Sequence, residues 1–219
     1  MSTRLEQARE NMVEQQVRTW EVLDPGVLDA LRTVPREDFV PAEYRRLAFS
    51  DLRVPIGEGQ VMMRPIEEGR MLQSLEIEPG QRVLEIGTGS GFTAACLVHL
   101  GAQVVSVEIS EQLAEAARRR LGKLAVEGVE VCQADALGEW APDGPFDAVV
   151  STGSAAAIPD RFRQWVGVGG RLFAVRGFSP VMEAVCLTRI SEQHWYEDSL
   201  FETDLPRLVG AEDKPVFRF

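Results

Sequence analysis

The sequence VLEIGTGSG at residues 83–91 decides the fold class of this 219-residue chain. Its first half is apolar, as a buried strand requires, and its second half has a glycine at every other position before the apolar segment 92–100. Glycines let the backbone approach a ligand that a Cβ atom would exclude, and the N–H groups at a helix start add hydrogen-bond donors. The stretch therefore predicts a strand, a ligand-binding turn and a helix.

Strand and helix patterns alternate after this turn. Short apolar runs typical of strands recur at residues 104–109, 129–134 and 146–152, and the first two enclose an amphipathic helix pattern at 110–125. Such alternation is typical of βαβ units, in which helices cover both faces of a parallel sheet. We therefore expect an α/β core with a doubly wound sheet.

The C-terminal third of the chain carries further strand patterns. A short helix is expected near 158–166, followed by strands at 171–177, 182–190 and 194–203. Because no helical segment separates the last two runs, they predict an antiparallel hairpin that closes one edge of the sheet.

Two helices are expected before the core. Apolar residues recur at helical intervals over residues 3–19 and 24–33. The second helix has Asp24 as an N-cap and Pro25 at its first helical position, an arrangement that favours a helix start.

The segment between these helices and the glycine turn is rich in proline and glycine. Residues 35–59 are expected to be irregular, and a third helix is expected from Pro65 to the break at Pro79-Gly80. We divide the chain into an N-terminal extension, residues 1–80, and a core, residues 81–219, which together form one structural unit.

Composition excludes several classes of function. The formal net charge is −11, from 23 basic and 34 acidic residues, which disfavours a nucleic-acid partner. No apolar run reaches the roughly 18 to 20 residues that cross a bilayer, and the charged N-terminus does not resemble a signal peptide, so we expect a cytoplasmic protein without a membrane partner. Three scattered cysteines and two histidines do not form a metal site.

Three acidic residues near strand ends define the expected ligand. Glu108 ends the second strand, where a carboxylate can bind both ribose hydroxyls of an adenosine. Asp135 follows the third strand, where it can meet an adenine amino group, and Glu85 precedes the glycines, where it would favour a ligand amine. Such a pocket suits the cationic, phosphate-free cofactor S-adenosylmethionine better than a dinucleotide, since a pyrophosphate adds negative charge.

The same three carboxylates also have structural interpretations. Glu85 could pair with an arginine, Glu108 could be a solvated strand end, and Asp135 could cap a turn. The predicted cofactor contacts are Glu85, Gly87, Thr88, Gly89, Ser90, Gly91, Glu108, Ile109, Asp135 and Ala136.

Five stretches of this sequence resemble the protein-L-isoaspartate O-methyltransferase family. They are NMVEQQVR at 11–18, VPREDFVP at 34–41, PIGEGQ at 55–60, LEIGTGSG at 84–91 and PFDA at 145–148. The resemblance implies a Rossmann-like sheet of seven strands with an N-terminal helical extension and S-adenosylmethionine as cofactor. It also implies methylation of isoaspartyl and D-aspartyl carboxylates in damaged proteins or peptides, a protein-repair activity.

The chain departs from the family pattern in the expected substrate loop. The family continues from Gly-Gln into a Thr-x-Ser-x-Pro-like run, whose hydroxyls help to hold the acceptor carboxylate, whereas this chain has Val61 and Met63 at those positions. Arg64 could replace the hydroxyls, because a guanidinium binds a carboxylate through two parallel hydrogen bonds. The predicted substrate-loop residues are Ile56, Gly59, Gln60, Val61, Met63 and Arg64.

The expected reaction needs no general base. Methyl transfer from a sulfonium is an in-line displacement, and a carboxylate acceptor is already ionised at neutral pH. We therefore assign no catalytic residue. Two alternatives stay open from the sequence: a methyltransferase for a small apolar acceptor, and a methyltransferase-like protein that binds the cofactor without turnover. The oligomeric state is also open.

Overall fold

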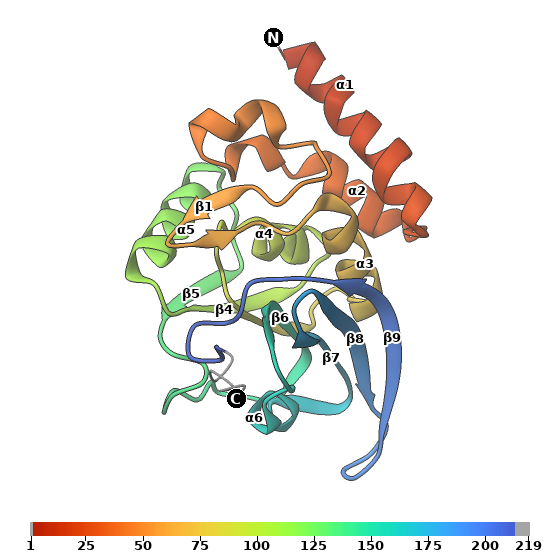
Figure 1. The fold of residues 1–219 in the computed structure, drawn as a ribbon, viewed down its shortest axis with the longest axis vertical. Helices are drawn as coiled ribbons and strands as arrows, with labels where there is room; N and C mark the ends of the chain where they lie inside the picture. Colours follow the sequence, from red (N-terminus) through yellow and green to blue (C-terminus); the bar gives the residue numbers. More distant parts are fainter. Residues whose placement is uncertain (1, 213–219) are drawn as a thin grey trace, which may run out of the picture.

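The computed structural model describes residues 2–212 and is built around one seven-stranded sheet (Figure 1). The strand order is β5-β4-β3-β6-β7-β8-β9. The first five of these strands run parallel, whereas β8 and β9 pair antiparallel with their neighbours. The strand bounds are β3 Arg82–Ile86, β4 Gln103–Glu108, β5 Val129–Gln133, β6 Phe146–Ala155, β7 Val166–Phe178, β8 Val181–Arg189 and β9 Trp195–Thr203.

Helices cover the two faces of the sheet unequally. Helices α3 (Pro65–Leu75), α4 (Phe92–His99) and α5 (Glu111–Lys123) pack with the N-terminal elements on one face, and the five-residue α6 (Asp160–Gln164) lies on the other. Side chains along β6 alternate between the faces, since Val150 belongs to the first hydrophobic cluster and Val149 to the second. The predicted doubly wound, mostly parallel sheet is confirmed.

The chain reverses its direction across the sheet between β3 and β6. Strands β3, β4 and β5 progress toward one edge, and the chain then returns to place β6 on the other side of β3. In open α/β sheets, such a reversal leaves a crevice outside the carboxyl ends of the strands, where ligands bind. The glycine turn follows β3 and therefore opens at this crevice.

The N-terminal extension is helical, as predicted. Helix α1 spans Ser2–Met12 and continues as a π-helical turn, Val13–Val17, and a 3₁₀ turn, Arg18–Trp20. In α2 (Pro25–Thr33), the Asp24 side chain accepts a hydrogen bond from Val27 N, which confirms the predicted N-cap.

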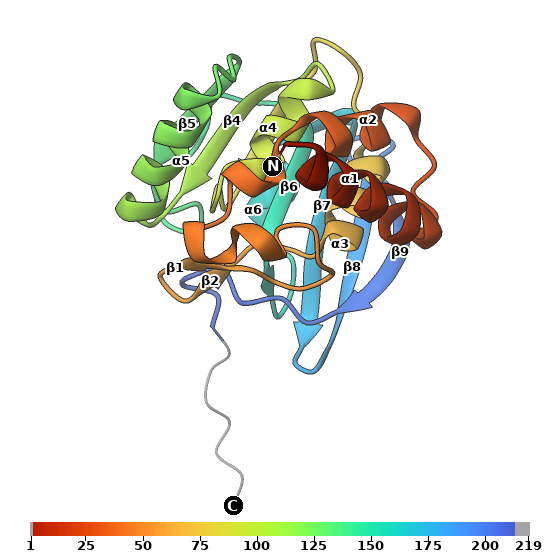
Figure 2. The same ribbon diagram turned by 90° about the horizontal axis from the view of Figure 1, so that it is seen from above.

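The proline- and glycine-rich segment forms short elements above the carboxyl end of the sheet (Figure 2). Two 3₁₀ helices, Arg36–Asp38 and Ala42–Leu47, precede a two-stranded hairpin of β1 (Pro55–Gly57) and β2 (Gln60–Val61). This hairpin carries the expected substrate loop.

Three element boundaries differ from those predicted. Helix α3 ends at Leu75, before Pro79, because Glu76 adopts a left-handed conformation. The helix expected near 158–166 ends at Gln164, and β7 begins at Val166, so it includes the glycines that were expected to precede it. The C-terminal hairpin is extended, since β7 also pairs antiparallel with β8.

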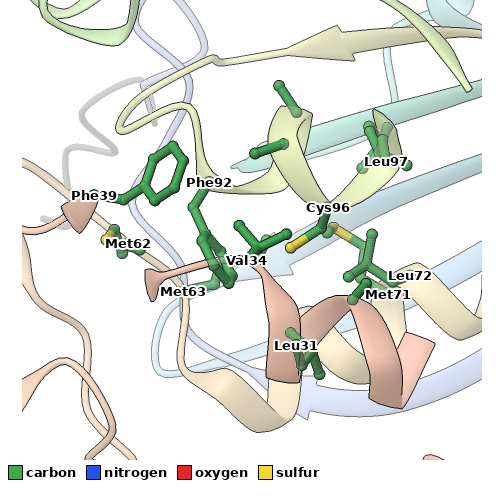
Figure 3. Packing of buried hydrophobic residues seen from close by; sticks show 14 of the residues in the cluster. Leu31, Val34, Phe39, Met62, Met63, Met71, Leu72, Phe92, Cys96 and Leu97 are labelled. Carbon is green, nitrogen blue, oxygen red and sulfur yellow. The ribbon is translucent and has the colours of Figure 1, made fainter. Parts of the chain in front are cut away.

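One hydrophobic cluster joins the N-terminal extension to the sheet (Figure 3). Phe39, Met62 and Met63 from the extension lie close to Phe92 of α4, and the Phe39 and Phe92 rings pack edge to face with their centroids 5.5 Å apart. The thiol of Cys96 is buried in this cluster beside Met71. The extension therefore shares its core with the helices that cover the sheet.

Within the described part of the chain, no helix has the length and apolar character that a membrane crossing requires. Among the same residues there is also no group of three or more histidine, cysteine or acidic side chains arranged to hold a metal ion.

Candidate active site

A cavity of about 450 Å³ lies at the carboxyl ends of β3, β4 and β5, beneath the β1–β2 hairpin. The glycine turn, the segments after β4 and β5, and the chain after β9 all contribute to its walls. Twelve predicted site residues line it: Ile56, Gln60, Val61, Met63, Gly87, Thr88, Gly89, Ser90, Glu108, Ile109, Asp135 and Ala136.

Two glycines of the turn face this cavity, and both require the absence of a Cβ atom. Gly87 has φ of +93°, and a Cβ there would lie 2.5 Å from Thr152 Oγ1. Gly89 has φ of +51°, and a Cβ would lie 3.1 Å from Ile56 Cδ1. The turn thus brings bare backbone to the wall of the cavity.

Gly91 has a different role from the one predicted. It has φ of +89° and starts α4, but it does not line the cavity. A Cβ at this position would lie 3.5 Å from Ala117 and Leu121 of α5. Because a Cβ at that distance would make only ordinary contact with α5, the left-handed backbone accounts for this glycine.

Glu108 connects the glycine turn to the start of α5. Its Oε2 accepts a hydrogen bond from Gly89 N at 2.9 Å, and its Oε1 accepts one from Ser110 N at 3.0 Å. The side chain is buried and lines the cavity. The alternative of a solvated strand end is therefore wrong.

Asp135 caps a turn and also lines the cavity. Its Oδ1 caps the following turn by accepting a hydrogen bond from Leu137 N at 2.8 Å. The residue also lines the cavity, together with Ala134 and Ala136.

Glu85 lies beneath the turn and does not line the cavity, so the predicted contact with a ligand amine is not what the structure shows. Its Oε2 accepts a short hydrogen bond from Ser106 Oγ, and that hydroxyl also lies 2.5 Å from Thr88 Oγ1. Burial, against the effect of the Ser106 hydrogen bond and together with the charges of Glu108 and Glu68, raises the pKa of Glu85 to about 8. The alternative of a pair with an arginine is not observed either.

The substrate loop places Gly59 and Arg64 away from the cavity. The Arg64 guanidinium donates to Glu67 Oε1 at 3.0 Å and lies 3.6 Å from Asp51 Oδ2. Arg64 is also the N-cap residue of α3, and its backbone N donates a hydrogen bond to Glu67 Oε2. Because these carboxylates already bind the guanidinium, the structure does not support Arg64 as the replacement for the missing loop hydroxyls.

The described residues that line the cavity carry acidic but no basic side chains. Lys, Arg and His are absent among them, and five carboxylates are present: Glu58, Glu68, Glu108, Glu111 and Asp135. Such a wall favours a cationic ligand and disfavours a pyrophosphate.

Comparison with known proteins agrees with this geometry. The sequence profile of the protein-L-isoaspartate(D-aspartate) O-methyltransferase family matches residues 7–190. The chain belongs to this family. A protein-L-isoaspartate O-methyltransferase of Methanoculleus marisnigri is 42% identical over 181 residues, covering 83% of this chain and 82% of the relative. A second, from Pelobacter propionicus, is 39% identical over 208 residues, covering 94% and 92%.

A solved structure has the same fold as this isoaspartate methyltransferase family member. It is a Plasmodium falciparum protein assigned to the same family and crystallised with S-adenosyl-L-homocysteine. It superposes with a TM-score of 0.78, covers 91% of this chain and 97% of its own, and is 17% identical. This structure shows the shared fold, and the family profile with the two relatives confirms the resemblance seen in the sequence.

Several residues that line the cavity in this family member were not predicted. The sequence placed Glu68 only in a helix and Thr152 only in a strand, and it assigned no role to Gly153 or Leu208. Leu208 reaches the cavity because Ser154 N donates to Pro206 O and Leu208 N donates to Ser154 O, which hold the chain after β9 against β6. No local pattern indicates this long-range pairing.

Proposed function

We propose that this chain is an S-adenosylmethionine-dependent O-methyltransferase that methylates isoaspartyl and D-aspartyl carboxylates in damaged proteins or peptides. Family membership supports the reaction and the acceptor. The observation that carries the proposal is the acid-lined cavity with its bare glycine turn at the carboxyl ends of β3 to β5.

The residues present fit this cofactor. Glu108 stands at the end of β4, where it is buried and lines the cavity, and backbone N–H groups hold both of its carboxylate oxygens. It would hold the ribose hydroxyls, and Asp135 would meet the adenine. Gly87 and Gly89 would let the amino-acid part of the cofactor lie against the turn. When bound there, S-adenosylmethionine supplies a methyl group that is activated by the adjacent sulfonium.

The side chains of the loop would desolvate the acceptor. Ile56, Met62 and Met63 are buried and line the cavity, and Leu208 adds a further apolar side chain to its wall. Exclusion of water strengthens the attraction between an acceptor carboxylate and a sulfonium. Alignment and desolvation are the main contributions that this displacement needs from the protein.

Incubation with methyl-labelled S-adenosylmethionine and an isoaspartyl peptide tests the proposal. The expected product is a base-labile methyl ester, and the same peptide with a normal aspartyl linkage should remain unlabelled. Glu108→Ala, which removes the expected ribose contact, is the variant that should lose labelling through weaker cofactor binding. Label in small molecules of a lysate, with none in the peptide, would support the small-acceptor alternative, and binding without transfer would support the non-catalytic one.

The location and partners of the protein remain predictions from its sequence. We expect a cytoplasmic protein that acts on damaged polypeptides and binds neither nucleic acid nor membranes. The net charge of −11 supports the exclusion of nucleic acid.

A further inference from the structure

Glu68 is an acidic residue in the wall of the cavity that neither cofactor recognition nor methyl transfer explains. It lies in the first half of α3, its side chain is only 3% exposed, and it lines the cavity on the side of the substrate loop. A carboxylate at this position would repel an anionic acceptor if it were ionised. The proposed function therefore requires an account of this group.

Arg36 holds Glu68 in place. The Arg36 side chain is completely buried, and its Nη1 donates a short hydrogen bond to Glu68 Oε2. The other donors of the guanidinium bind Ala48 O at 2.8 Å and Met63 O at 2.7 Å. Its plane lies against the Phe92 ring, 4.7 Å from the centroid. Each of the three guanidinium nitrogens thus donates a hydrogen bond, and the group fixes both Glu68 and the backbone of the substrate loop.

We propose that Glu68, in its protonated form, binds a carboxylate in the cavity by donating a hydrogen bond from Oε1. It would take over the task of the two loop hydroxyls that Val61 and Met63 have replaced. This inference rests on the proposed function, because the carboxylate belongs either to the isoaspartyl acceptor or to the amino-acid part of the cofactor. Where Glu68 is ionised before binding, it takes up a proton from solvent on binding, and no covalent bond is broken.

The charges around Glu68 support a proton at this site. Burial raises the pKa of Glu68 to about 7, although Arg36 lowers it, and the neighbouring Glu67 raises it. Glu85 from β3 and the Cys96 thiol from α4 are coupled electrostatically to it. A bound carboxylate adds a further negative charge, so it favours the protonated form of Glu68.

Glu67, the adjacent carboxylate, does not compete for this role. It accepts hydrogen bonds from Arg53 Nη2 at 2.6 Å, Arg64 Nη2 at 3.0 Å and Thr203 Oγ1 at 2.6 Å. These donors keep it ionised, since they lower its pKa against the effect of burial. The pKa values of these two adjacent glutamates on α3 are therefore shifted in opposite directions, and of the two only Glu68 lines the cavity.

Calorimetry measures the predicted proton uptake directly. Binding is titrated at pH 7 in two buffers that differ in ionisation enthalpy, first with S-adenosylhomocysteine and then with an isoaspartyl peptide added to that complex. The wild type should take up a substantial fraction of one proton in one of these two steps, and Glu68→Gln should take up none. Absence of uptake by the wild type in both steps overturns the proposal.

Two ligands identify which carboxylate is bound. 5′-Methylthioadenosine lacks the amino-acid part of the cofactor, and a peptide with a carboxamide in place of the acceptor carboxylate lacks the acceptor charge. Uptake that disappears with the first ligand assigns the carboxylate to the cofactor, and uptake that disappears with the second assigns it to the acceptor. Uptake that survives both replacements shows that no carboxylate is responsible, and the proposal is then wrong.

The affinity for the ligand that carries the bound carboxylate should depend on pH, because only protonated Glu68 donates the hydrogen bond. From pH 6 to 8.5, a group with a pKa of about 7 passes from mostly protonated to mostly ionised, so the wild-type affinity should fall about 30-fold. Glu68→Gln keeps a donor at the same position and should have an affinity that is nearly constant over this range. Met63→Ser, which restores a loop hydroxyl, should weaken the pH dependence.

A matched control is available in a second buried pair. Glu37 is paired with Arg9 at 2.6 Å outside the cavity, so Glu37→Gln should retain the wild-type pH dependence. If the dependence disappears in Glu37→Gln or Glu85→Gln but persists in Glu68→Gln, the proposal is overturned. Failure of the wild type to methylate any isoaspartyl peptide rejects the proposed function. In that case, the proton uptake measured with S-adenosylhomocysteine still tests whether Glu68 binds a carboxylate in its protonated form.

Discussion

Substitution of Glu85 by glutamine should change how the stability of the protein depends on pH. The carboxyl group is completely buried beneath the glycine turn, where Ser106 donates to Oε2 and Oε1 has no partner among the described residues. Its pKa is raised from 4.5 to about 8, first of all by burial. Between these two values, the folded protein binds a proton that the unfolded chain releases.

The sign and size of the effect follow from proton linkage. Because the folded-state pKa is raised, the contribution of Glu85 to stability is fully present below pH 4.5 and is lost as the pH rises through 8. Between pH 5 and 8.5 the loss amounts to about 3 to 4 kcal/mol, at about 1.4 kcal/mol for each pH unit. Glutamine cannot ionise, so Glu85→Gln should lack this loss.

Urea unfolding at several pH values between 5 and 8.5 provides the assay. The free energy of unfolding of Glu85→Gln relative to the wild type should become more favourable by about 3 to 4 kcal/mol across this range. Glu115→Gln, at an exposed position of α5, is the control and should run parallel to the wild type. Parallel curves for Glu85→Gln as well would show that Glu85 is ionised in the folded protein at neutral pH, and the reasoning would be refuted.

Three further predictions concern the turn and the core. Glu108→Ala should weaken S-adenosylhomocysteine binding by about 1.5 to 3 kcal/mol, because the substitution removes a charged hydrogen-bond acceptor. Calorimetry measures this loss, and an unchanged affinity would exclude Glu108 from the cofactor site. Gly87→Ala should lower both the cofactor affinity and the melting temperature, since φ is +93° and the new Cβ would lie 2.5 Å from Thr152 Oγ1. A variant with the melting temperature of the wild type would contradict the strain inferred here. Phe39→Ala should destabilise the protein by about 3 to 5 kcal/mol in urea unfolding, because the ring is completely buried against Phe92, and a loss below 1 kcal/mol would be inconsistent with that packing.

The sequence predicted well wherever local patterns carry the information. The glycines at 87 and 89 need positive φ, and an apolar run before a glycine turn leaves few alternatives to a buried strand. The N-cap at Asp24 was also readable, since its hydrogen bond reaches only three residues along the chain. Helix ends were less accurate, because the left-handed residue at Glu76 is not a glycine and gives no local signal.

The sequence could not separate residues that face the cavity from those that lie behind it. Glu85 and Glu108 are both carboxylates close to strand ends, yet only Glu108 lines the cavity. On β3 the side chain of Glu85 meets Ser106 of the adjacent β4, and that neighbour is known only once the strands are paired. Arg64 was misjudged for the same reason, since Glu67 and Asp51 bind it in the folded chain.

The amino-acid sequence alone thus determined the order of strands and helices, the glycine turn, the acidic character of the pocket and the family to which the chain belongs. Only the tertiary structure decided which carboxylates line the cavity, that Arg36 binds Glu68 from 32 residues away, and that Leu208 contributes to the cavity wall. The physical reason is that turns, caps and amphipathic patterns depend on residues a few positions apart. Burial, pKa and pairing of a side chain depend instead on neighbours that packing brings together from distant parts of the chain.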